Sequence, residues 1–95
     1  MTDVTVTVPT LNEEEYLPEC LDGMEQAISQ TDKDVEVTVI DSNSKDSTVS
    51  IAENHEIVDE IYFSEKGILK ARDKGIREAE GDIVVCIDAD TTYPQ

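Results

Sequence analysis

Segments with the pattern of β-strands alternate along this chain with segments of helical periodicity, and this alternation limits the fold more than any other feature. Each strand candidate is a short run of β-branched or apolar residues, at positions 4–8, 35–40, 58–63 and 83–87. A helix between consecutive strands brings the chain back to the same end of the sheet, which makes the strands parallel. We therefore predict a βαβαβαβ domain of the α/β class, with its ligand site beyond the carboxyl ends of the strands.

Three helices are expected between these strands. The first is predicted to be capped by Asn12 and to carry Glu13 in its first turn, where negative charge suits the helix dipole. Its buried stripe follows at helical spacing: Leu17, Cys20, Leu21, Met24, Ala27 and Ile28. The second helix is expected at 46–54, and the third begins at Gly67 and ends at Gly81, where glycine permits a left-handed C-cap.

Residues 83–87 form a continuously apolar run that leads directly into Asp88 and Asp90. Such a run is typical of a parallel strand covered on both faces. Because the aspartates are two positions apart, an extended backbone points both carboxylates to the same side, and such hard oxygen ligands suit Mg²⁺ or Mn²⁺. The alternative for an isolated Asp-x-Asp is a loop-capping role. Placement after an apolar strand, in a chain whose second strand also ends in Asp41, favours the metal site.

The charge of the chain excludes some partners. Its 95 residues include 23 acidic and 7 basic side chains, a formal net charge of −16, and such a surface repels nucleic acid. Acid along the whole chain suits concentrated salt, because screening relieves the repulsion. Full stability in dilute buffer would argue against this halophilic hypothesis. The cysteines form no Cys-x-x-Cys pair and no apolar run reaches membrane length, so we expect a soluble cytoplasmic domain.

Three segments resemble, in the same order, the signatures of family 2 glycosyltransferases with the GT-A fold. They are Val8-Pro-Thr-Leu-Asn-Glu-Glu14, Val39-Ile-Asp-Ser-Asn-Ser-Lys-Asp-Ser-Thr48 and Ala79-Glu-Gly-Asp-Ile-Val-Val-Cys-Ile-Asp-Ala-Asp90. The similarity includes Lys70-Ala-Arg-Asp-Lys-Gly-Ile76 and covers nearly the whole chain. It implies a single Rossmann-like nucleotide-binding domain over residues 1–95, with strand order 3-2-1-4.

The resemblance also assigns roles to the first two signatures. The loop with Pro9, Thr10, Asn12 and Glu13 would line the nucleotide pocket, and Asp41 would hydrogen-bond the base or ribose of a nucleotide-sugar donor carrying UDP or GDP. Structural alternatives stay open, because Glu13 also suits the helix dipole and Asp41 also suits a turn.

The third signature and the helix before it would hold the rest of the donor. Asp88 would reach the ribose or a metal-bound water, and Asp90 would ligate the divalent ion that bridges the donor phosphates. Arg72 would help to hold the nucleotide, with a surface cation as the alternative. Two residues depart from the usual pattern: Asn43 stands where Gly is more frequent, and Asp73 where Asn is. Asn tolerates positive φ, whereas Asp73 leaves one contact in doubt.

In this family a carboxylate base and most acceptor contacts follow the Asp-x-Asp strand, and here only residues 91–95 follow it. We therefore expect donor binding without transfer by this chain, with the base of an inverting reaction beyond Gln95. The ending Asp-Ala-Asp-Thr-Thr-Tyr-Pro is similar to members that load sugars onto polyprenyl phosphate. That implies a lipid-phosphate acceptor and a parent protein at the cytoplasmic face of a membrane. An uncovered strand at 83–87 also predicts self-association.

Two other functions stay open. A phosphoacceptor receiver domain is also a small acidic α/β unit with a Mg²⁺-binding carboxylate cluster, but its first strand should end in acidic residues, whereas here Pro9 and Thr10 end it. The other is a nucleotide-binding fragment without a catalytic parent. The chain has neither a Gly-x-Gly-x-x-Gly turn nor a Gly-Lys-Ser/Thr loop, so dinucleotide oxidoreductases and P-loop NTPases gain no support.

Overall fold

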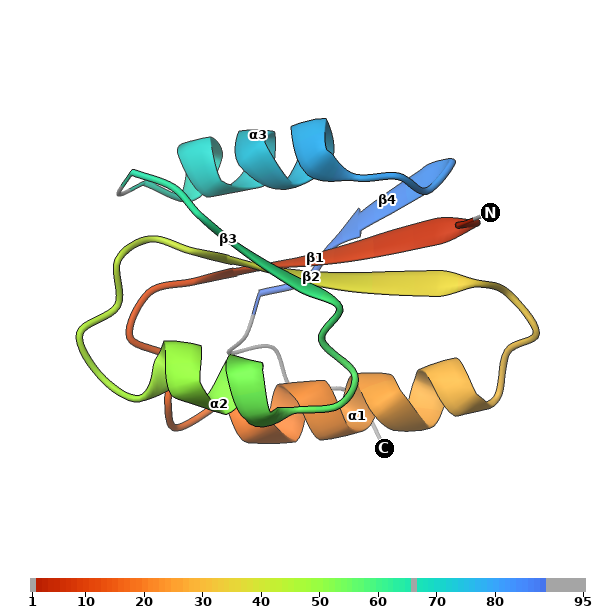
Figure 1. Cartoon of the computed structure of the whole chain (residues 1–95), viewed down its shortest axis with the longest axis horizontal. Coiled ribbons are helices and arrows are strands. Elements are labelled where there is room, and N and C mark those ends of the chain that lie inside the picture. The colour runs from red at the N-terminus through yellow and green to blue at the C-terminus, as the bar shows by residue number, and fades with distance from the viewer. Residues whose placement is uncertain (1, 66, 89–95) are drawn as a thin grey trace.

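A parallel sheet forms the centre of the molecule (Figure 1). The computed structural model describes residues 2–65 and 67–88. Its elements are β1 (Val4–Thr10), α1 (Leu17–Ser29), β2 (Val35–Asp41), α2 (Thr48–Asn54), β3 (Glu60–Phe63), α3 (Ile68–Glu78) and β4 (Ile83–Cys86). The four strands lie in the order β3-β2-β1-β4, and every pair is parallel. The predicted class and strand order are confirmed.

The helices cover the two faces of the sheet unequally: α1 and α2 lie on one face and α3 lies on the other (Figure 1). The alternation within β1 explains how one strand serves both layers, since successive side chains point to opposite faces. Val6 and Val8 belong to the core under α1 and α2, while Thr5 and Thr7 face α3.

The core under α1 and α2 is aliphatic. The predicted stripe of α1 is confirmed for Leu17, Cys20, Leu21 and Met24, which are buried against the sheet. Ala27 was predicted to be buried but is exposed, and Ile28 is only partly buried. The core cluster comprises Val6, Val8, Leu17, Cys20, Leu21, Met24, Val37, Val39 and Ala52. Most of the buried apolar residues in the described part of the chain therefore lie on this side.

The layer under α3 consists mostly of small and polar side chains, although Ile40 of β2 is a fully buried aliphatic residue on this face. Ala71 is buried on α3, and a Cβ atom added to Gly75 would come within 3.0 Å of Thr7 Cβ and Cγ2. Opposite the helix lie threonines of β1 and the buried Thr38 of β2. The helix therefore approaches the sheet closely because its contact residues have almost no side chain. Two of its larger apolar residues, Leu69 and Ile76, are 76% and 56% exposed.

The start of α1 differs from the prediction. Asn12 does not cap the helix; the N-cap is Tyr16, and Glu13 precedes the first turn, although the Leu17 N–H donates to the Glu13 carbonyl at 2.9 Å. Asn12 instead has a left-handed backbone, with φ 54°. The predicted cap was wrong because Asn12 bonds to another loop and not to its own helix.

Other boundaries also moved. The second helix begins at Thr48 rather than at 46, and the third strand begins at Glu60 rather than at 58. The third helix ends at Glu78, and among the described glycines only Gly67 has a positive φ, so the left-handed C-cap predicted at Gly81 is wrong. A Cβ at Gly81 would come within 2.6 Å of the Thr5 backbone nitrogen, and the Gly81 N–H donates to Thr5 Oγ1 at 2.8 Å. Gly81 therefore serves close packing against β1.

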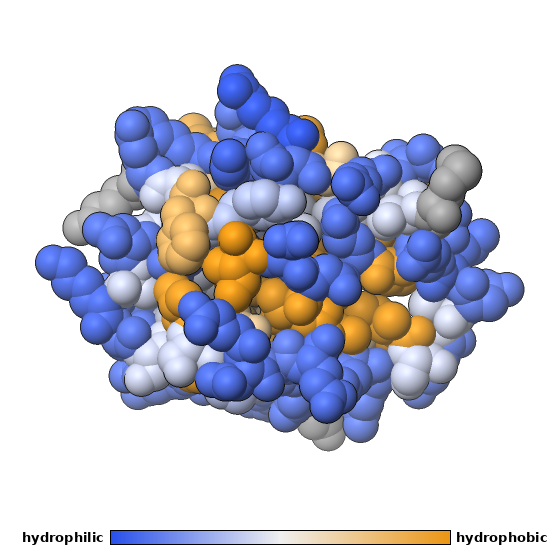
Figure 2. All heavy atoms as spheres, in the orientation of Figure 1, coloured by the Kyte–Doolittle hydropathy of each residue, from blue (hydrophilic) through white to orange (hydrophobic). Residues whose placement is uncertain are grey.

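The last strand is less covered than its apolar sequence predicts. Within the described residues β4 pairs only with β1, and its side chains Ile83 and Val85 are 60% and 39% exposed. The opposite edge, along β3, also carries exposed apolar side chains between the two helical layers (Figure 2). No described helix is long and apolar enough to cross a membrane.

Candidate functional site

The carboxyl ends of all four strands meet at one edge of the sheet, because the strands are parallel. Thr10 and Asp41 end β1 and β2 and pair with each other in register. The backbone N–H of Ile87 donates to the Thr7 carbonyl at 3.0 Å, which places the following Asp88 beside the end of β1. The edge thus collects the predicted donor-binding residues from three neighbouring strands.

Asp41 lies beneath this edge and is fully buried, with 0% exposure. Its Oδ1 accepts hydrogen bonds from Thr10 Oγ1 at 2.7 Å and Ser44 Oγ at 2.6 Å. Its Oδ2 accepts the Ser44 backbone N–H at 2.7 Å. A buried carboxylate needs such donors, because a group removed from water without partners is strongly unfavourable.

The loop after β1 and the loop after β2 are joined through side chains. The Asn12 N–H donates to Ser44 Oγ at 2.8 Å, and the Lys45 N–H donates to Asn12 Oδ1 at 2.9 Å. Both loops contain an asparagine in the left-handed region, Asn12 at φ 54° and Asn43 at φ 68°. The loop at Asn43 therefore keeps the positive φ that glycine more often provides.

A second set of bonds joins the loops farther along. The Glu13 N–H donates to Thr48 Oγ1 at 2.8 Å, and Thr48 in turn makes a short hydrogen bond to Asp46 Oδ1. Asp46 Oδ2 accepts the Glu14 N–H at 3.3 Å, and Glu14 Oε2 accepts the Ser47 N–H at 3.2 Å. The hydroxyl of Thr48, with backbone N–H groups, holds the pKa of Asp46 below its ordinary value.

The sequence predicts no individual role for Ser44, Asp46 or Thr48, which belong to the second family signature. Serine and threonine two or three positions after an aspartate are a signal for a turn held by side chains, and that signal was present. The partners in the first loop could not be found that way, because they lie more than 30 positions away in the chain.

On the β4 side, Arg72 of α3 reaches across to Asp88, with 3.6 Å between Nη2 and Oδ1. Both side chains are about two-fifths exposed, at 42% and 43%. Arg72 Nε is buried and has no hydrogen-bond partner within the described residues. The structure thus brings together two predicted site residues from separate elements. Asp90 lies outside the described residues.

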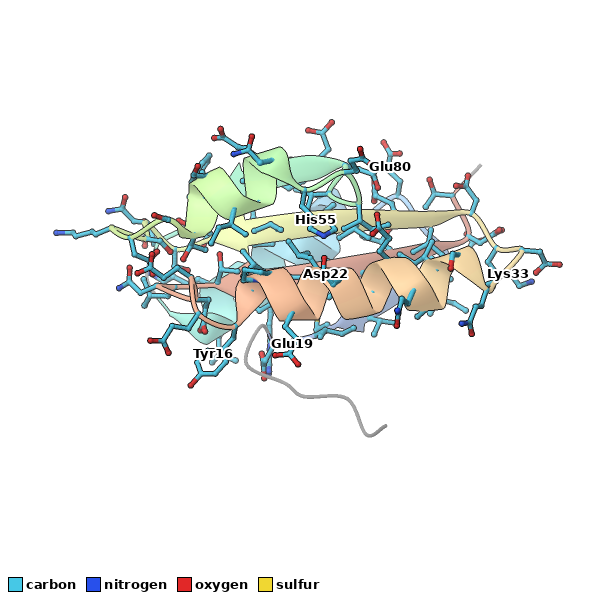
Figure 3. All side chains as sticks on the ribbon, turned by 90° about the horizontal axis from the view of Figure 1, so that it is seen from below. Tyr16, Glu19, Asp22, Lys33, His55 and Glu80 are labelled. Atoms are coloured by element: carbon cyan, nitrogen blue, oxygen red, sulfur yellow. The ribbon has the colours of Figure 1, made fainter. Side chains whose placement is uncertain are left out.

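A separate carboxylate and histidine cluster lies between α1 and α2 (Figure 3), where Asp22, Glu25 and His55 place ligand atoms within 4.8 Å of one another. His55 Nδ1 accepts the Ile57 N–H at 3.2 Å, so a neutral ring carries its proton on Nε2, which lies 2.9 Å from Asp22 Oδ1. Metal coordination through Nε2 would need the opposite tautomer. His55 is mostly buried, with 16% of its side chain exposed, and its contact with Asp22 ties α1 to the end of α2.

The family model described as "Glycosyl transferase family 2" matches residues 5–95. An undecaprenyl-phosphate 4-deoxy-4-formamido-L-arabinose transferase of Proteus mirabilis is 31% identical over 96% of this chain and 30% of its own length. A mannosyltransferase of Pyrobaculum calidifontis, solved with GDP-Man and Mn²⁺, is 37% identical with a TM-score of 0.77, over 97% of this chain and 28% of that one.

A third similar structure is glucosyl-3-phosphoglycerate synthase of Mycobacterium tuberculosis, solved with Mn²⁺, UDP and glucosyl-3-phosphoglycerate. It is 27% identical with a TM-score of 0.80, over 98% of this chain and 35% of that one. The chain spans about a third or less of the length of these relatives.

Proposed function

Because the chain belongs to glycosyl transferase family 2, we propose that it is the donor-binding part of a glycosyltransferase and binds a nucleoside-diphosphate sugar with Mg²⁺ or Mn²⁺. The observation that carries this proposal is the convergence of Thr10, Asp41 and the Arg72–Asp88 pair at the carboxyl edge of the sheet. Open α/β sheets bind their ligands at this edge. Similar structures solved with GDP-Man or UDP, each with Mn²⁺, support the same ligand class.

The first loop would form the nucleotide side of the pocket, with Pro9, Thr10, Asn12 and Glu13 around it and Asp41 below. Asn12 and Glu13 are fixed by the loop-to-loop hydrogen bonds, so their backbone is already ordered before a ligand binds. An ordered loop lowers the entropic cost of binding. UDP and GDP both remain candidates for the nucleotide.

The described residues fit a divalent cation in part. Asp88, two residues after β4, provides a partly exposed carboxylate of the oxygen type that Mg²⁺ and Mn²⁺ prefer. Asp90 would be the direct ligand and Asp88 would reach a bound water or the ribose. When bound, the cation neutralises the negative charge of the departing nucleoside diphosphate. In a chain of net charge −16, a diphosphate needs that compensation.

Arg72 would supply further positive charge to the same pocket. A guanidinium has five N–H donors, and its contact with Asp88 leaves others for a phosphate or ribose oxygen. Because Arg72 also neighbours Asp88, it would orient that carboxylate in the absence of donor. The inverting displacement itself would use an acceptor and a base beyond Gln95, so we expect the 95-residue chain to bind donor and transfer nothing.

Calorimetric titration of the chain with UDP, GDP and their sugar conjugates, with and without Mn²⁺, tests the donor site. We expect binding that needs Mn²⁺ and is lost in Asp90→Ala. Asp82→Ala is the matched control. It also removes one carboxylate, from an exposed position that directly precedes β4 and lies at the amino end of that strand. Equal loss in both variants, or no binding by the folded wild-type chain, would contradict the proposal.

For the acceptor of the parent protein, we propose a polyprenyl phosphate. The Proteus mirabilis relative, whose name specifies undecaprenyl phosphate, supports this acceptor class. It would place the parent at the cytoplasmic face of a membrane. Incubating the parent with labelled donor and either undecaprenyl phosphate or a sugar acceptor tests it: label in the lipid phase is expected, and label only in the sugar acceptor would exclude the idea.

We also propose that the isolated chain self-associates through β4. The exposure of Ile83 and Val85 on a strand with one described partner supports this. The net charge opposes association, so high salt should promote it. Sedimentation at increasing concentration in high salt should show dimers that Val85→Lys removes. A monomer throughout would exclude this contact.

A further inference from the structure

We propose that Asp41 is a positioning residue of the donor site: its buried carboxylate does not contact the donor but holds the loop after β2 against the loop after β1. This inference rests on the proposed function for its ligand, and it changes the role of a residue that the family resemblance assigns to direct contact. The three hydrogen bonds to Asp41 from Thr10 and Ser44 carry it.

The first step is that Asp41 has little capacity for another partner. A carboxylate has about four acceptor positions on its two oxygens. Three are taken by donors at 2.6–2.7 Å, all from within the chain. The residue is 0% exposed, and Thr10 and Ser42 beside it are 3% and 4% exposed. A ligand atom could reach its oxygens only after these neighbours moved.

The second step is that the hydrogen bonds have a defined direction. A backbone N–H can only donate, so Ser44 Oγ accepts from the Asn12 N–H and must use its single proton toward Asp41 Oδ1. The bonds therefore run from the first loop, through a hydroxyl, to the buried carboxylate. Each bond polarises the next, which strengthens such a chain.

The third step is what this chain of bonds holds in place. The Asn12 N–H donates to Ser44 Oγ, and the Asn12 side-chain oxygen accepts the Lys45 N–H. Asn tolerates the left-handed φ of 54°, and these hydrogen bonds select that conformation over the others open to it. Removing the Asp41 carboxylate would release Ser44 first and then Asn12. The loop proposed to line the nucleotide pocket would lose its fixed shape.

The same pattern occurs a second time and provides a matched control. Glu13 N–H donates to Thr48 Oγ1, which donates to Asp46, but this carboxylate is only partly buried. Asp41→Asn and Asp46→Asn make the same chemical change. In Asp41→Asn an NH₂ group replaces one carboxylate oxygen, so one of the donors that now bond to Asp41 loses its acceptor. No water can replace that acceptor at a buried site, whereas solvent can do so at Asp46.

Donor affinity with Mn²⁺ is the first test. We expect Asp41→Asn and Ser44→Ala each to raise the Kd by about tenfold, as the loss of a buried charged hydrogen bond would. The double variant should be no worse than Asp41→Asn alone, because both remove one connection. Ser44→Thr keeps the hydroxyl and should restore binding, and Asp46→Asn should have the smaller effect. Additive losses in the double variant would overturn the inference in favour of direct contact.

Amide hydrogen exchange without any ligand separates the two proposals. In Asp41→Asn and in Ser44→Ala the amides of Asn12, Ser44 and Lys45 should exchange faster, while those of Val37 and Val39 in β2 stay protected. A tenfold weaker Kd with unchanged loop exchange would mean that Asp41 touches the donor, and would overturn the inference. If the wild type binds no donor, the proposed function fails, and the exchange rates alone still decide whether Asp41 holds the loops.

Discussion

The two faces of the sheet are held by different means. Under α1 and α2, the buried valines of β1 and β2 pack against Leu17 and Leu21, which are also buried. Under α3, threonines meet Ala71 and Gly75, and two of the larger apolar residues of that helix are exposed. The first layer gains stability from apolar area and the second from close approach of backbones. We therefore expect apolar burial to contribute less to holding α3, which carries Arg72, than to holding α1.

Truncating one leucine on each layer should give the largest contrast. Leu21→Ala should lower the free energy of unfolding by about 2–5 kcal/mol, because it leaves a cavity in a core where Leu21 is fully buried. Leu69→Ala on α3 should change it by less than about 0.5 kcal/mol, since Leu69 is 76% exposed. Urea unfolding followed by circular dichroism measures both. Equal losses would mean that the two layers do not differ as described.

Adding a methyl group under α3 should have an intermediate effect. The new carbon of Gly75→Ala would lie 3.0 Å from Thr7, and such overpacking costs about 1–3 kcal/mol. The gain in helix propensity offsets roughly 1 kcal/mol of this. We expect a net loss near 1 kcal/mol in the same unfolding assay. Thr7→Ala removes two of the three crowding atoms, so the double variant should recover part of the loss; a stabilised Gly75→Ala would show that the layer is loose.

The smallest change should come from a buried threonine. Thr38 Oγ1 is buried under α3 without a hydrogen-bond partner among the described residues. Thr38→Val keeps the shape and removes an unpaired polar group, so it should raise the free energy of unfolding by about 0.5 kcal/mol. Thr7→Val should not gain in this way, because the Thr7 hydroxyl donates to Cys86 Sγ at 3.3 Å. A destabilised Thr38→Val would show that this hydroxyl has a partner after all.

The prediction from sequence succeeded where the signal repeats along one element. The run of β-branched residues at 4–8 predicted a strand. The helical spacing of Leu17, Cys20, Leu21 and Met24 predicted the buried stripe of α1. The parallel order of the sheet followed from the alternation of elements and from the family resemblance. The structure places Thr10, Asp41 and Asp88 at the carboxyl edge, where a ligand site was expected. Their roles in donor binding are proposals.

The prediction from sequence failed for residues whose hydrogen-bond or packing partners lie far away in the chain. Asparagine is a preferred N-cap residue, but the hydrogen bonds of Asn12 go to Ser44 and Lys45 in another loop. Gly81 has the position of a C-cap, but its lack of a side chain serves contact with Thr5. In both cases a local propensity worth about 1 kcal/mol was outweighed by tertiary contacts.

The sequence by itself determined which segments are strands and helices, which residues form most of the buried stripe of α1, and that the acidic and hydroxyl residues gather after the strands. These properties depend on side-chain period and composition, which act over a few neighbouring residues. Only the tertiary structure decided that Asp41 is buried beneath Thr10 and Ser44, that Arg72 meets Asp88, and that α3 approaches the sheet through Gly75. Those facts depend on distances between residues far apart in the chain, which no local pattern encodes.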